Sequence, residues 1–305
     1  MSTQKPANHG AGPQHAGVGL RKLAAGLVVI AIVLLQTAAS PRAVAAPRPA
    51  FFVDRGGLVL HAAQIYLLYW GSAWTNSATS APTPDQITAE FRWVVTGPYL
   101  TGLAEYRNIQ PPTLRAATVV SGSDPPTGFD DHAVRDFLDA QLDAGVVPEP
   151  DSDNQSLYFV LVPSGVSSGG DSSDFTAEHY YFTRHHQRIH YAWTADSGSL
   201  AATTGVMSHE LVESLTDPEG NAITGLAGSC AGDGWCEIAD VCHDTSTANG
   251  ATVTTYWSQR ARACIAPDLA STTPPPPSRA TTSTPCPTRS SHAPTTARRP
   301  IDPCE

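Results

Sequence analysis

One short stretch of the sequence has the residue types and the spacing of a metal site. Residues four apart share a face of an α-helix, so His209 and Glu213 can point at one ion. Glu210 lies beside that pair, where it can take a proton from water bound to the ion. This is the arrangement of the His-Glu-x-x-His zinc helix, with Glu in place of the second His. The spacing predicts a zinc site with His209 and Glu213 as ligands and Glu210 as the general base.

The alternative is an acidic, solvated helical face whose side chains only form pairs four residues apart. The residues that precede the motif are mostly apolar, which predicts that the His and the two carboxylates are partly buried. Buried like charges need a cation or a proton beside them. The apolar neighbours are Leu200, Ala201, Ala202, Val206 and Met207.

A second acidic cluster, Trp235 to His243, follows and offers a third ligand. Zinc enzymes commonly take the third ligand from such a downstream segment and leave a fourth position for water. Asp240 ranks first, because its carboxylate lies next to a cysteine anchor at Cys242. Glu237 is the second candidate, either as a ligand or as a residue that supports a ligand by a hydrogen bond. His243 is the third candidate.

The rest of the chain alternates strands and helices, which predicts an α/β (or α+β) domain around one mixed sheet. Apolar runs indicate buried strands, and apolar residues at helical spacing indicate amphipathic helices. The expected strands are 57–70, 114–120, 157–162 and a strand or hairpin over 180–193; the expected helices are 85–96, one that starts at 130–131, and 200–215.

The two ends of the sequence read differently from its middle. Residues 1–45 carry a basic pair, an apolar run over 23–35 and a small-residue pattern at Ala43–Ala45, which is the order of a secretory signal peptide. A retained signal anchor is the rival interpretation. Residues 271–305 are rich in Pro, Thr and Ser and cannot bury a core, so we expect a disordered tail. The domain is expected over 46–270, secreted and monomeric, with no stable membrane span after signal cleavage.

Charge and cysteine content fit an extracellular protein. Residues 46–270 hold 10 basic and 26 acidic side chains, and such a surface repels phosphate, so nucleic acid is an unexpected partner. Six cysteines in an exported chain predict disulfides. A zinc knuckle is disfavoured, because there is no Cys-x-x-Cys pair. Which cysteines pair with one another stays open.

The sequence resembles the EXORDIUM-like (phosphate-induced protein) family over roughly 56–264. The similar stretches are Ser208 to Glu213, Thr216 to Pro218, Glu237 to Cys242, Gly57 to Leu60, Tyr69 to Trp74 and Pro98 to Tyr106. The resemblance implies a secreted or wall-associated protein with a zincin-like helix. No substrate follows from it, and Cys236 departs from the Gly that is usual in the family.

Two functions remain open from the sequence. One is a zinc-dependent, peptidase-like hydrolase that uses metal-bound water on a peptide or cell-wall substrate. The other is a non-catalytic extracellular or wall-associated protein with a structural metal site. Two carboxylate ligands make zinc a poorer Lewis acid than a two-His, one-Glu set does. A Glu210 that faces an open cleft would favour the hydrolase.

Other histidines are weaker candidates. In a strand, His186, Arg188 and His190 share one face and His185 points the other way. They line a cleft beside the helix or belong to a solvated hairpin.

Overall fold

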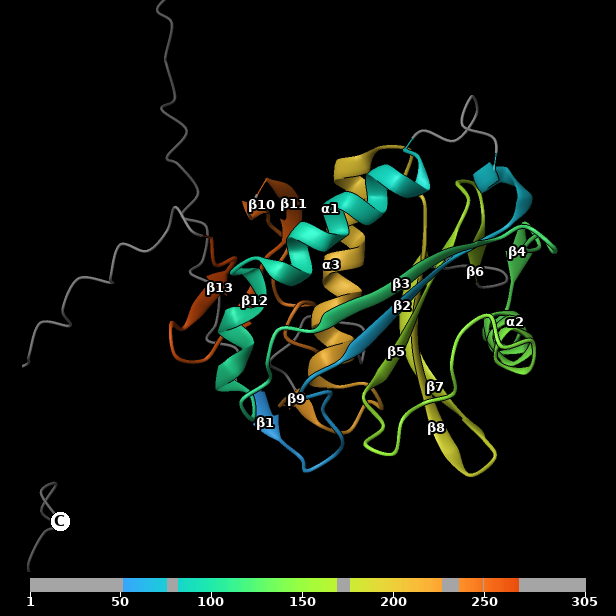
Figure 1. Ribbon diagram of the computed structural model, residues 1–305. Helices are drawn as coiled ribbons and strands as arrows, with labels where there is room; N and C mark the ends of the chain where they lie inside the picture. Colours follow the sequence, from blue (N-terminus) through green and yellow to red (C-terminus); the bar gives the residue numbers. More distant parts are fainter. Residues whose placement is uncertain (1–51, 76–81, 169–175, 227–235, 249, 269–305) are drawn as a thin grey trace, which may run out of the picture. The chain divides into compact units, whose positions relative to one another are not determined.

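Figure 1 shows the protein as a computed structural model. The structure describes residues 52–75, 82–168, 176–226, 236–248 and 250–268, all within one structural unit. The predicted signal peptide (1–45) and tail (271–305) lie outside the described residues, as do Cys230, Cys286 and Cys304.

A mixed sheet of five strands forms the centre of the fold, which confirms the predicted α/β class. The strand order is β3-β2-β5-β8-β7, and only the pairing of β7 with β8 is antiparallel. The central strand β5 is buried on both faces, as its sequence SLYFVLV requires. The strand bounds are β2 Gln64–Trp70, β3 Thr113–Val120, β5 Ser156–Val162, β7 Ala177–Arg184 and β8 Gln187–Ala195.

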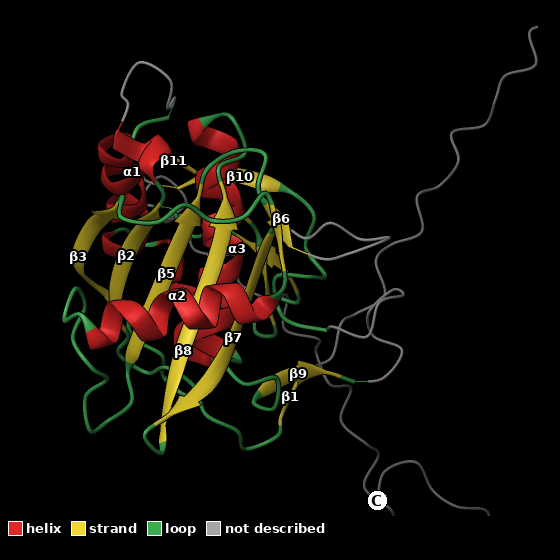
Figure 2. Ribbon diagram, turned by 90° about the vertical axis from the view of Figure 1, so that its right-hand side faces the viewer, coloured by secondary structure: helices red, strands yellow, loops and turns green. Residues whose placement is uncertain are grey.

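Helices cover both faces of this sheet (Figures 1 and 2). α1 (Pro84–Thr96) and α3 (Leu200–Thr216) lie on one face, where Phe91 meets Phe159 edge-on with ring centroids 5.6 Å apart. α2 (Asp131–Asp143) covers the other face, where Phe137 stacks on Trp70 at 4.3 Å. Each face therefore has its own apolar core.

The helices begin where the sequence supplies caps. Thr83 and Gln86 form a capping box at the start of α1, and Pro84 occupies its first position. At the start of α3, the Ser199 hydroxyl accepts a hydrogen bond from the Ala202 N–H at 3.2 Å. These signals explain the starts of α1 and α3, which lie within one residue of the predicted bounds; α2 also starts as predicted, but Asp130 forms no side-chain capping bond there.

Small two-stranded sheets and 3-10 turns complete the described fold. β1 (Phe52–Asp54) pairs with β9 (Ile223–Gly225), β4 (Gly128–Phe129) with β6 (Ser167–Ser168), β10 (Thr245–Ala248) with β11 (Ala251–Thr254), and β12 (Tyr256–Ser258) with β13 (Ala263–Ile265). The 3-10 turns are η1 (Ser72–Thr75) and η2 (Tyr99–Glu105). No helix in the described ranges is both long and apolar enough to cross a membrane.

One local prediction was wrong. Residues 57–63 do not belong to the strand that starts at Gln64. The Leu60 amide donates to Leu215 O at the end of α3 at 3.0 Å, and the Ala62 amide donates to the Gln155 side chain. The hairpin alternative for 180–193 is confirmed: His185 and His186, with φ of 47° and 67°, form the exposed two-residue loop between β7 and β8 and take no strand positions. Of the expected face only Arg188 and His190 remain, and His190 is fully buried against Glu219 at 3.0 Å.

Candidate metal centre

The two predicted helix ligands meet on α3. The Nε2 atom of His209 lies 3.1 Å from Oε1 of Glu213, one turn further along the helix. Asp240 joins them from the downstream segment, with its Oδ1 3.6 Å from the same nitrogen. The side chain of Glu213 is buried, whereas His209 and Asp240 remain 25% and 29% exposed. Glu213 thus lies on the buried side of the group, and His209 and Asp240 lie on the side that solvent reaches.

The spacing of these donors fits a metal ion. For a tetrahedral zinc ion with bonds of about 2.1 Å, ligand atoms lie about 3.4 Å apart. The two distances from His209 bracket that value. All three donor atoms lie within 4.8 Å of one another.

Helix α3 is held rigidly in the core. The Ser208 hydroxyl accepts a hydrogen bond from the Thr254 N–H of β11 at 2.9 Å and donates to Gly205 O at 2.7 Å. Leu211, Val212 and Leu215 are fully buried. Because Glu210 and Glu213 are buried as well, the motif is not a solvated acidic face.

The segment that carries Asp240 is fixed at several points. A disulfide joins Cys242 to Cys264, which confirms the prediction of disulfides and gives one pairing that the sequence left open. Cys236 is also disulfide-bonded. The buried Ile238 accepts a backbone hydrogen bond from the Trp257 N–H at 2.8 Å.

The buried charges of this group shift the pKa values of its members. Burial raises the pKa of Glu213 well above its usual range, and the neighbouring Glu237 and Glu210 raise it further. Burial lowers the pKa of His209, but the carboxylates around it outweigh burial and raise that pKa to about 11. Glu213 Oε1 is buried and accepts no hydrogen bond, despite its closeness to His209. The charge of His209 compensates this oxygen in the metal-free protein, and a bound cation would take over that role.

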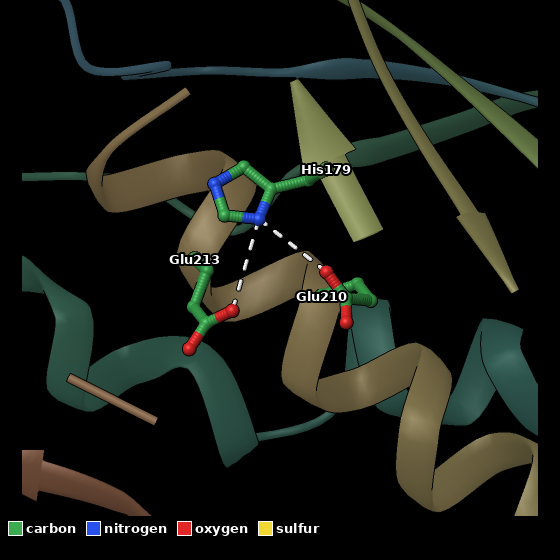
Figure 3. A group of neighbouring side chains, drawn as sticks. All are labelled: His179, Glu210 and Glu213. Atoms are coloured by element: carbon green, nitrogen blue, oxygen red, sulfur yellow. Dashed lines mark hydrogen bonds and ion pairs between the residues drawn. The ribbon is translucent and has the colours of Figure 1, made fainter. Parts of the chain in front are cut away.

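The sequence interpretation missed His179 on the edge strand β7, whose side chain is only 8% exposed. Figure 3 shows its ring directed at Glu210 and Glu213, with Nδ1 3.3 Å from Glu210 Oε2 and 3.7 Å from Glu213 Oε2. On the other side of the ring, Nε2 lies 3.2 Å from the backbone oxygen of Asp217 and 3.4 Å from Glu237 Oε1. Burial lowers the pKa of His179, but these carboxylates outweigh it, so that pKa is well above the usual range.

The other predicted site residues divide between the two histidines. Asp240 lies with His209, whereas Glu237 lies behind His179 and bonds to Asp240 only through its backbone N–H, which donates to Asp240 Oδ2 at 3.0 Å. Glu210, the expected base, contacts His179 and has a side chain only 8% exposed. His243 is exposed on the loop after Cys242.

His179 carried no motif that could single it out. Its register opposite Ala192 places it on the sheet face that packs against α3. The register of β7 on β8, which the sequence does not give, is needed to see that His179 lies on that face.

Comparisons with family models, with curated proteins and with solved structures give no match for this chain, so the resemblance to the EXORDIUM-like family stays a prediction.

Proposed function

We propose that this chain is a secreted, zinc-dependent hydrolase of the peptidase type, with the ion held by His209, Glu213 and Asp240. The observation that carries the proposal is the convergence of one imidazole nitrogen and two carboxylates at separations of 3.1 and 3.6 Å. A buried Glu213 oxygen without a hydrogen bond points to the same place. One nitrogen and two oxygen donors are a ligand set that zinc accepts.

The residues around the ion have distinct tasks. His209 and Asp240 are partly exposed, so a substrate carbonyl can approach from their side. A bound zinc ion supplies Lewis acidity, which lowers the pKa of water and polarises a carbonyl. Glu210, next to His209 in the chain, accepts the proton of the attacking water and passes it to the departing amine. The oxygen of water bonds to the carbonyl carbon and the carbon–nitrogen bond breaks, so atoms and charge balance.

A structural metal site in a non-catalytic extracellular protein is the second candidate. One observation favours it: Glu210 is buried and held against His179 instead of facing solvent. In that case the ion would serve to join α3 to the segment that carries Asp240. The two candidates share the same ligands and differ only in the task of Glu210.

Metal content and one substitution separate them. The purified chain, dialysed against limiting free zinc, should hold about one ion per molecule. His209→Ala should lose it, because the substitution removes the nitrogen ligand. His132→Ala is the matched control: His132 is exposed on α2 and has Asp136 four residues later, and this variant should keep the ion.

Glu210→Gln is the decisive variant, because it removes the proton acceptor and keeps the shape. The hydrolase proposal expects normal folding, one retained ion and loss of cleavage in a broad peptide library by about 100-fold or more. Cleavage by wild type and variant alike would contradict the assigned base. Absence of zinc from wild type, together with an unchanged melting temperature of His209→Ala, would overturn both metal candidates.

A further inference from the structure

Glu213 stands between two histidines and turns one carboxylate oxygen toward each. Oε1 faces His209 on the solvent side, and Oε2 faces His179 on the buried side. The second group, formed by His179, Glu210 and Glu213, also has three donor atoms within 4.8 Å of one another. In metal sites with two ions, about 3.5–4 Å apart, a single carboxylate can serve both ions.

The hydrogen bonding of His179 requires a positive charge between its Nδ1 atom and the two carboxylates. The backbone oxygen of Asp217 can only accept, so the Nε2 atom 3.2 Å away carries the ring's proton. A neutral ring then presents the lone pair of Nδ1 to Glu210 and Glu213, which are themselves acceptors. Lone pairs that face one another need a positive charge between them, either a second proton or a metal ion.

The Nε2 side of the His179 ring has the partners that are usual for a metal-binding histidine. Histidines that bind metals usually donate their other N–H to a backbone carbonyl or a carboxylate, which fixes the ring and makes it a stronger ligand. His179 has both partners, the Asp217 carbonyl and Glu237. The role of Glu237 is then to support His179 rather than to bind the first ion.

We propose that His179 Nδ1, Glu210 and Glu213 form a second site for a divalent ion such as zinc, which inhibits the protein when filled. Inhibition rests on the proposed function, because an ion bound to Glu210 takes away the carboxylate that accepts the proton. Binding itself does not rest on it. The second site is the weaker one, since Glu213 already shares its charge with the first ion and all three side chains are buried.

A zinc titration tests the second site directly. Bound zinc per molecule of the purified chain is measured by elemental analysis over a range of buffered free-zinc concentrations. Wild type should fill in two steps, to about one ion and then to about two. His179→Ala should keep the first step and lose the second, and His209→Ala should lose the first. A wild type that stops at one ion would overturn the proposal, because a proton then occupies the position beside His179.

Two further variants guard against a misfolded His179→Ala. His179→Gln keeps a polar side chain of similar length, and Glu210→Gln removes a ligand that only the second site uses. Both should lose the second step and retain the first. A second step that persists in these folded variants would place the additional ion elsewhere and contradict the assignment.

Peptide cleavage, measured in the same titration, separates the two proposals. In wild type it should fall as the second step fills, and in His179→Gln it should stay constant over the same range. If no cleavage is seen at any zinc concentration, the hydrolase proposal fails, while the two steps in metal content still decide the second site.

Discussion

Glu213 Oε1 lies 3.1 Å from His209 Nε2 and yet accepts no hydrogen bond. The two groups form an ion pair in the metal-free protein, and their separation also suits two ligands of one ion. Helix spacing sets the pair, since the two residues are one turn apart on α3. The third member, Asp240, comes from a loop that the helix does not control.

The identity of the third ligand can be tested by alanine substitution. We expect Asp240→Ala to lose the ion that is held at limiting zinc, because its carboxylate shares the His209 site. Glu237→Ala should retain that ion, since Glu237 lies on the far side of His179. His243→Ala is the exposed control. Metal content after dialysis gives the order, and loss of the ion from Glu237→Ala but not from Asp240→Ala would reverse the assignment.

Much of the fold was predictable, because local signals and packing agree. Pro84 and the capping residues Thr83 and Ser199 mark helix starts, and the run at Ser156–Val162 can only be a buried strand. The helical pair of the site followed from spacing alone. Residues 57–63 were misassigned because an apolar run is typical of a buried strand, but it also occurs in buried backbone whose hydrogen bonds lie outside a sheet.

The rest of the site depends on tertiary structure. His179 and Glu210 are 31 residues apart in the chain, and they meet only because β7 is the antiparallel edge strand beside α3. Nothing in the composition of β7 distinguishes the face that packs on α3 from the other. The division of Glu237 and Asp240 between two histidines likewise depends on how the 236–242 segment turns.

Removal of the Cys242–Cys264 disulfide should weaken both the fold and the first metal site. The bond spans 22 residues, and closing a loop of that length stabilises a fold by about 3 kcal/mol. A Cys242→Ser, Cys264→Ser variant should lose about that much free energy of unfolding in urea. Its zinc affinity should also fall, because Asp240 lies two residues from Cys242. Unchanged affinity in a destabilised variant would show that the backbone bonds of the segment suffice to place Asp240.

We expect Asp217 to make the metal-free protein less stable as the pH rises. Burial is the main cause that raises its pKa from 3.8 to about 6. An acid with a higher pKa in the folded state binds its proton more tightly there, so ionisation favours unfolding. The free energy of unfolding should therefore fall between pH 4 and pH 6 and level off above pH 6. The fall should be at most about 3 kcal/mol, because each unit of difference between the folded and unfolded pKa is worth about 1.4 kcal/mol.

Asp217→Asn tests this in chelated protein, because the amide keeps an acceptor for the Ala222 N–H. Urea unfolding at pH 4 and pH 7 should show a smaller loss of stability in the variant than in wild type. Glu213 contributes with the same sign in both proteins, so only the difference between them reports on Asp217. Equal losses would mean that Asp217 does not carry the raised pKa.

Two serines on α3 provide a matched pair for testing how firmly the site helix is held. Both are buried, but Ser208 accepts the Thr254 N–H, whereas the Ser214 hydroxyl has no hydrogen-bond partner in the described structure. Ser208→Ala leaves that N–H unsatisfied and should cost about 1–3 kcal/mol of unfolding free energy. Ser214→Ala removes an unpaired hydroxyl and should be neutral or slightly stabilising. Because Ser208 precedes His209, its loss should also lower zinc affinity, and Ser214→Ala should leave affinity unchanged. Equal effects of the two substitutions on urea unfolding and zinc affinity would contradict an anchoring role for Ser208.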